Sequence, residues 1–87
     1  MKTPTVHING TSQKDLLAQL QTVYRACAVA QQALAAATPN GRDYYPQGPE
    51  ALRQALAAHQ ARCQAIAAVQ ADMVALATEL QSHASAA

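Results

Sequence analysis

The 87-residue sequence contains no tryptophan and no phenylalanine, and only 13% of its residues are charged. Much of its 51% hydrophobic content is alanine, whose burial contributes only about 0.8 kcal/mol per residue. The larger apolar residues are eight Leu, five Val, two Ile, two Met and three Tyr. So small a set barely offsets the entropy lost on folding, about 1.5 kcal/mol per ordered residue. We therefore expect one domain over residues 1–87 that forms a homo-oligomer, with a dimer as the simplest form.

The sequence also lacks a strong charge of either sign, since its formal net charge is +1. Its basic residues are scattered and show no basic stripe, which argues against a nucleic-acid partner. No apolar run is long enough to span a bilayer, and the first residues lack the apolar core of a signal peptide. Two cysteines in such a chain favour a reducing, cytoplasmic setting. The basic residues are Lys2, Lys14, Arg25, Arg42, Arg53 and Arg62.

No catalytic constellation and no phosphate-binding glycine loop is recognisable, so we expect neither enzymatic activity nor a cofactor. His59 and Cys63 are one helical turn apart, and a hairpin would bring Cys27 to a similar level. A zinc site needs three or four such ligands, so we favour two buried thiols beside a histidine and assign no metal site. A Cys27–Cys63 disulfide is geometrically conceivable but disfavoured in a reducing cell.

What the sequence does contain is a segment rich in proline and glycine, T-P-N-G-R-D-Y-Y-P-Q-G-P at 38–49, between two stretches rich in Ala, Gln and Leu. Proline and glycine interrupt helices, whereas Ala, Gln and Leu propagate them. The sequence therefore predicts an all-α antiparallel hairpin of two long helices, at 12–38 and 49–82, joined by a connection at 38–49.

Residues 4–9 alternate in polarity, with Val6 and Ile8 on one side, which predicts a short extended segment or strand. The first helix is expected from about Gln13 to Ala37. Ser12 is the expected N-cap, with Thr11 as the alternative. The first helix carries a heptad seam of Leu16, Leu20, Val23, Cys27, Ala30, Leu34 and Ala37.

The second helix is expected to begin with Pro49 and to run to about Ser82. Two steps of three, from Cys63 to Ile66 to Val69, indicate a local overwinding, although Gln70 would preserve the heptad. Its seam is Leu52, Leu56, His59, Cys63, Ile66, Val69, Met73, Leu76 and Leu80.

A hairpin closed at the connection pairs residues whose numbers sum to about 88. This register places Leu34 against Leu52 or Leu56, Val23 against Ile66, and Leu16 against Met73. The second helix then outruns the first at the chain ends, leaving Leu76 and Leu80 to be covered by the Val6/Ile8 segment of the same or another chain.

One hairpin cannot bury a second apolar line beside the seam. We therefore expect a homodimeric four-helix bundle, and we predict that its interchain contact contains Leu17, Tyr24, Val69 and Leu76.

Arg42, Asp43, Tyr44 and Tyr45 stand together in the connection, and Tyr and Arg are residues that anchor protein interfaces. They form the candidate protein-interaction site. The alternative is that the tyrosines close the open end of the hairpin while Arg42 and Asp43 pair to hold the turn. We expect Tyr44 to point outward, because Tyr45 precedes Pro46 and should be extended.

The pattern V-H-I-N-G-T-S at 6–12, then P-N-G-R-D-Y-Y-P-Q-G at 39–48 and His59, Arg62 and Cys63 in the second helix, resembles a family of small proteins encoded in tailed-phage and prophage genomes. The resemblance implies a phage context, in a bacterial cytoplasm or on the virion, and no catalytic residues. It favours an accessory or assembly module that binds a phage or host protein. The alternative is a small nucleic-acid-associated protein that uses Arg25, Arg42, Arg53 and Arg62.

Overall fold

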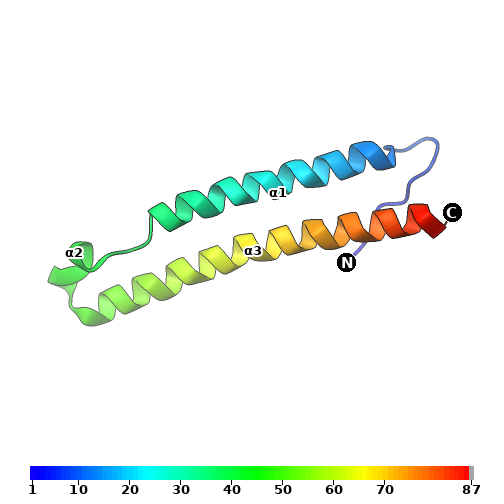
Figure 1. Cartoon of the computed structure of the whole chain (residues 1–87). Helices are drawn as coiled ribbons and strands as arrows, with labels where there is room; N and C mark the ends of the chain where they lie inside the picture. The colour runs from blue at the N-terminus through cyan, green and yellow to red at the C-terminus, as the bar shows by residue number, and fades with distance from the viewer. Residues whose placement is uncertain (87) are drawn as a thin grey trace.

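The computed structural model describes the backbone of residues 1–86 and the side chains of residues 1–83. Two long antiparallel helices, α1 (Gln13–Ala36) and α3 (Pro49–Ala86), form an open hairpin (Figure 1). The single turn α2 (Gly41–Tyr44) and the 3₁₀ helix η1 (Tyr45–Gln47) join them. The molecule measures 61 × 19 × 18 Å. The prediction of an all-α hairpin is confirmed.

Local signals set the ends of α1. The Ser12 hydroxyl accepts a hydrogen bond from the Asp15 amide at 3.1 Å, so Ser12 is the N-cap and Asp15 lies at the positive end of the helix dipole. At the other end the amide of Ala37 still bonds to Ala33, after which Pro39 cannot continue the helix. These two ends leave α1 much shorter than α3.

The connection contains more regular structure than a simple turn. Asn40 caps α2 by accepting from the amide of Arg42, and η1 follows without a break. Gly48 then has φ +93° and ψ 166°, a conformation open almost only to glycine. This residue redirects the chain into α3, which begins with Pro49 at its first position, where no amide hydrogen is needed.

The register of the hairpin differs from the prediction. The Gln13 side chain bonds to the carbonyl of Leu80, and the Gln70 side chain bonds to the carbonyl of Tyr24. The helices are therefore displaced by about six residues from the expected pairing. The displacement arises because α2 and η1 occupy the space beside the start of α3, where a Cβ added at Gly41 would lie 3.8 Å from the Leu52 side chain. The first turns of α3 therefore extend past the end of α1 (Figure 1).

The expected overwinding of the second helix is not seen. Gln70 is half-buried and reaches across to α1, whereas Val69 remains 39% exposed. The seam therefore keeps its heptad through Ile66, Gln70 and Met73. Gln70 tolerates this position because its amide donates to a main-chain carbonyl, which offsets the cost of removing it from water.

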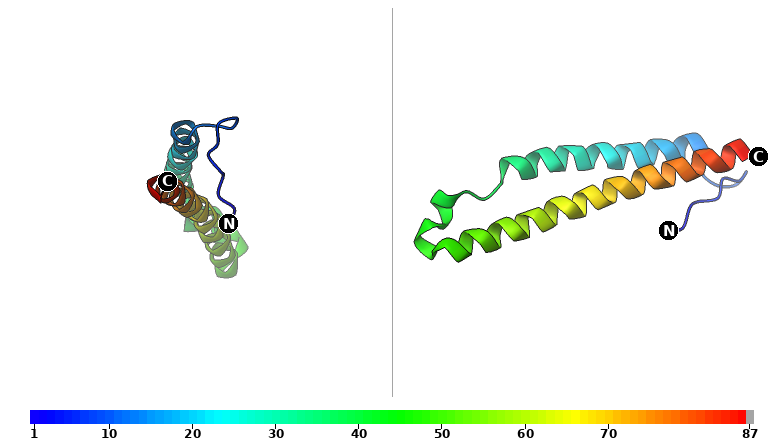
Figure 2. Two further views of the ribbon diagram at one scale, coloured as in Figure 1. Left: turned by 90° about the vertical axis from the view of Figure 1, so that its right-hand side faces the viewer. Right: turned by 60° about the horizontal axis from the view of Figure 1, so that its bottom comes forward.

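Residues 4–9 form no strand; they run as an irregular segment that returns along the last turns of α3 (Figure 2). Thr3 donates a hydrogen bond to Glu79, and Val6 lies with Leu80 around a small hollow. Leu80 is only 1% exposed, so the segment covers it as expected. Ile8 is 97% exposed and takes no part in the cover.

The core is thin. Among the described side chains only Cys27, His59 and Leu80 are buried. The chain exposes 6429 Å², whereas a compact monomer of 9.1 kDa exposes about 4,900 Å². The excess is about 1,500 Å², since the two helices have no third layer over their flanks and the N-terminal segment and the connection are also exposed.

Candidate interaction site

The connection is held by Asn40 rather than by an Arg42–Asp43 pair. Asn40 Oδ1 accepts from the Arg42 amide at 3.0 Å, and Asn40 Nδ2 donates to Asp43 Oδ2 at 3.1 Å. Among the described residues the one ion pair joins Glu50 to Arg53 at 3.0 Å, where both side chains are exposed. The alternative in which Arg42 and Asp43 pair to hold the turn is therefore wrong in that respect. The Arg42 side chain is exposed, so it is available at the end of the molecule.

The two tyrosines have the opposite exposure to that expected. Tyr45 is 84% exposed, whereas Tyr44 is half-buried. Tyr45 is not extended but helical, with φ −51° and ψ −44°, because it opens η1 and Pro46 takes an early helical position that needs no amide hydrogen. The outward aromatic residue of the connection is therefore Tyr45, and Tyr44 is the one that packs.

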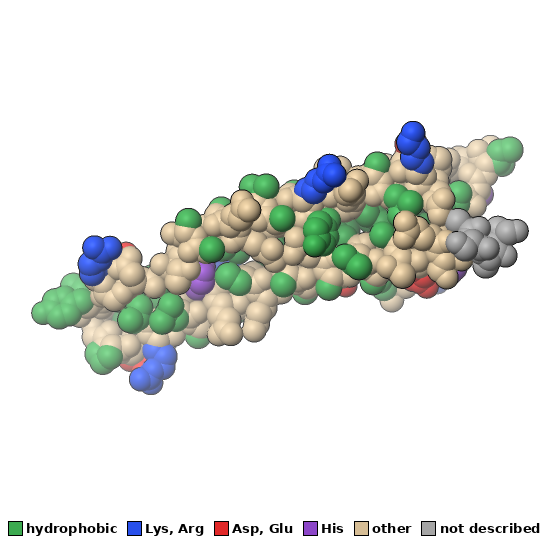
Figure 3. Space-filling view, in the orientation of Figure 1, with side chains coloured by type: hydrophobic (Ala, Val, Ile, Leu, Met, Phe, Trp, Pro, Cys, Tyr) green, Lys and Arg blue, Asp and Glu red, His purple; other side chains and the backbone are tan. Residues whose placement is uncertain are grey.

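A groove of about 740 Å³ runs along one flank of the hairpin, toward the chain ends. Its walls come from the first three turns of α1 and the last turns of α3. In Figure 3 apolar side chains gather between the two helices in the right-hand half of the view. We call this surface the groove flank; its apolar members are Leu17, Ala18, Leu20, Tyr24, Met73, Val74 and Ala77.

The four residues expected in one interchain contact do not share a surface. Leu17 and Tyr24 line the groove, but Val69 and Leu76 do not. Val69 and Val74 are five residues apart and so project about 140° from each other on α3. Val69 and Leu76 therefore belong to the opposite flank. The sequence analysis missed Val74 and Met73 as neighbours of Tyr24, because the heptad seam of the second helix omits Val74 and its expected register pairs Met73 with Leu16.

His59 and Cys63 lie one turn apart on α3, beside the end of α1. Cys63 Sγ is 3.6 Å from His59 Nε2, and the same nitrogen is 3.2 Å from Thr38 Oγ1. Both cysteines are free thiols. Within residues 1–83 no three His, Cys, Asp or Glu side chains are grouped so that they could hold a metal ion.

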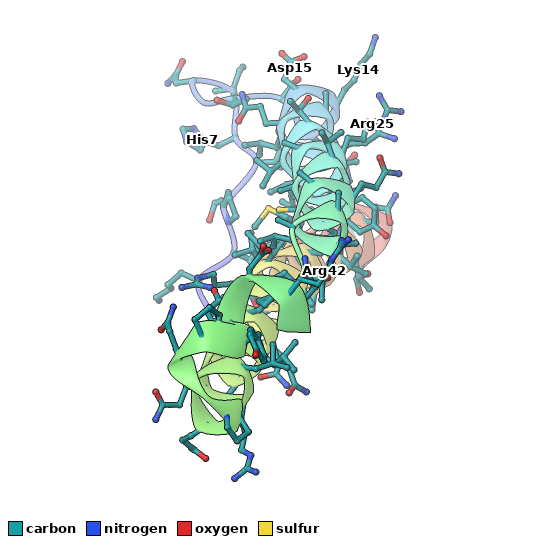
Figure 4. All side chains as sticks on the ribbon, turned by 90° about the vertical axis from the view of Figure 1, so that its left-hand side faces the viewer. His7, Lys14, Asp15, Arg25 and Arg42 are labelled. Atoms are coloured by element: carbon teal, nitrogen blue, oxygen red, sulfur yellow. The ribbon has the colours of Figure 1, made fainter. Side chains whose placement is uncertain are left out.

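Basic side chains do not gather on the visible face of the molecule; Lys and Arg stand apart from one another in Figure 3. Lys14 and Arg25 project outward from α1. Arg42 lies on α2 at the connection end of the hairpin, and His7 lies on the N-terminal segment (Figure 4). This distribution lacks the continuous basic surface that tracks a phosphate backbone. In the described part of the chain, no helix is long and apolar enough to cross a membrane.

Comparison with protein families, with curated proteins and with solved structures finds no match to this chain. Two exposed surfaces of the hairpin, the groove flank and the connection, are the candidates for binding a partner.

Proposed function

We propose that this chain is a non-enzymatic interaction module in which two copies pack their groove flanks together as a four-helix bundle. The observation that carries the proposal is the excess exposed area of about 1,500 Å² over a compact chain of this mass. Each partner in a standard protein interface buries about 800 Å². One hairpin therefore exposes more area than such an interface requires.

The groove flank fits a second copy of the same kind of surface. Leu17 and Tyr24 from α1 face the same side as Val74 from α3, so a partner helix pair meets apolar side chains from both helices. Tyr24 is 42% exposed and Val74 is 52% exposed, so both have area left to bury. Packing of two such flanks gives the usual layers of a four-helix bundle.

The connection is the surface by which the assembled module engages another protein. In the proposed dimer it stays at the outer end of each hairpin, with Tyr45 and Arg42 exposed. The resemblance to small phage and prophage proteins favours an accessory or assembly role during infection, in the cytoplasm of a bacterial host or on the virion, with a phage or host protein as the partner.

Sedimentation equilibrium or light scattering of the purified chain at micromolar concentration tests the proposal. We expect the mass of two chains at this concentration. A monomeric mass with full helicity contradicts self-association. Retention of duplex DNA in a gel-shift assay at moderate salt, lost as salt rises, would instead support the nucleic-acid alternative.

A further inference from the structure

Cys63 and His59 form a polar pair that the proposed assembly does not use. His59 is buried, with 9% of its surface exposed, although histidine carries two polar ring nitrogens. Cys63, one turn further along α3, is half-buried and so keeps a path to solvent. Cys63 lies ten residues before Met73, about 15 Å along the helix, and it is not among the residues that line the groove.

The hydrogen bonds of Thr38 show which ring nitrogen of His59 carries a hydrogen. The single hydroxyl proton of Thr38 is donated to the carbonyl of Ala35 at 2.8 Å. Thr38 Oγ1 can then only accept from His59 Nε2, which lies 3.2 Å away. His59 Nε2 therefore carries hydrogen, and two acceptors lie within reach of this nitrogen, Thr38 Oγ1 at 3.2 Å and Cys63 Sγ at 3.6 Å.

A thiolate at Cys63 would accept a charge-assisted hydrogen bond from this N–H, which is stronger than the bond between neutral groups. The thiolate is the nucleophilic form of cysteine. Thr38 acts as a positioning residue, because it holds the imidazole in place.

We propose that Cys63 is a modification site that undergoes thiol–disulfide exchange with low-molecular-weight disulfides, with His59 as the donor to its thiolate. The Cys63 thiol loses its proton to solvent, and Sγ attacks one sulfur of the disulfide. The sulfur–sulfur bond of the reagent breaks, a mixed disulfide forms at Cys63, and the released thiolate takes a proton from water. This inference is independent of the proposed self-association.

The chain contains its own reference thiol, since Cys27 is buried at 8% exposure in the seam of the hairpin. The experiment uses the full chain as Cys27→Ser and as Cys63→Ser, each with one thiol. A dipyridyl disulfide is the probe, and the absorbance of its released thione gives the rate. We expect the thiol of Cys27→Ser to react at least about tenfold faster than that of Cys63→Ser. It should also react faster in native buffer than in denaturant.

The role of His59 is tested in the Cys27→Ser chain. His59→Leu should slow the reaction about tenfold, because the donor is lost. If the substitution only loosened the hairpin, Cys63 would become more exposed and would react faster. Loss of the hydrogen-bond donor and loosening of the fold therefore change the reaction rate in opposite directions. Thr38→Val should also slow the reaction, and Thr38→Ser should restore it. If His59→Leu does not fold, the rates of Thr38→Val and Thr38→Ser test the role of His59 instead.

Three results would overturn the proposal. One is an unchanged or higher rate in both His59→Leu and Thr38→Val. Another is a Cys63 that reacts more slowly in the folded chain than in denaturant. The third is equal reactivity of the two cysteines in native buffer.

Discussion

Gln13, in the first turn of α1, donates a side-chain hydrogen bond to the main-chain carbonyl of Leu80, with 3.1 Å between Nε2 and the oxygen. Gln70 makes the corresponding bond in the other direction, to the carbonyl of Tyr24 at 3.2 Å. Two glutamines, one from each long helix, thus fix how far the helices slide past each other. Slippage would leave both amides without these partners, at a cost of about 1 kcal/mol each.

Self-association should depend on Leu17, which is half-buried in one hairpin and lines the groove flank. Leu17→Asp places a charge where the second copy packs, and we expect it to weaken the dimer about tenfold or more. Val29→Asp is the matched control, since Val29 is on the same helix, 66% exposed and outside the groove. Light scattering across a dilution series measures both variants. Equal effects of the two changes would rule out the groove flank as the interface.

The tyrosines of the connection should behave differently on removal. Tyr44→Ala should lower the free energy of unfolding by about 1–2 kcal/mol, because this ring is half-buried. Tyr45→Ala should change it by less than about 0.5 kcal/mol, since the ring is 84% exposed. Thermal melts give the comparison. If Tyr45 is an anchor for a partner, Tyr45→Ala should also lose that partner while its melting temperature stays unchanged.

Gly48 should tolerate no side chain. Its φ of +93° makes Gly48→Ala costly by about 1–3 kcal/mol, even though a Cβ there would meet no atom within 4 Å. Gly41→Ala is the control, because Gly41 is helical and its Cβ would lie at an ordinary distance from Leu52. Urea unfolding should show a loss for Gly48→Ala and no loss for Gly41→Ala. A stable Gly48→Ala protein would mean that the chain enters α3 in another conformation.

The N-cap of α1 should contribute measurably to the free energy of unfolding. Ser12→Ala removes the acceptor of the Asp15 amide and should cost about 1 kcal/mol. Thr11→Ala should cost less, because Ser12 and not Thr11 makes that bond. Urea unfolding of the two variants decides between them, and a larger loss for Thr11→Ala would move the start of the helix by one residue.

Local chemistry in the sequence was enough to predict the two long helices and their ends near the connection and at Ser12. The strand expected at 4–9 is absent, α2 and η1 were not predicted, and α3 runs to Ala86 rather than to about Ser82. Ser12, Pro39 and Pro49 act through bonds and steric clashes within a few residues, so the helix ends can be found without knowing the fold. The heptad spacing likewise predicted that Leu20, Cys27 and Leu34 face inward, and they are buried or half-buried. The exposed connection was also recognisable, because its proline, glycine and tyrosine residues stand out from the alanine-rich helices.

Only the tertiary structure decided which surfaces those elements form. The register depends on the room that α2 and η1 take beside Leu52, and no local rule gives that volume. The flank of the hairpin on which Tyr24 lies sets Val74 rather than Val69 beside it, and the register brings His59 to Thr38. The exposure of Tyr45 rather than Tyr44 follows from a helical turn that the following proline alone would disfavour. In an alanine-rich hairpin many registers bury similar area, so a few specific contacts, such as those of Gln13 and Gln70, select one of them.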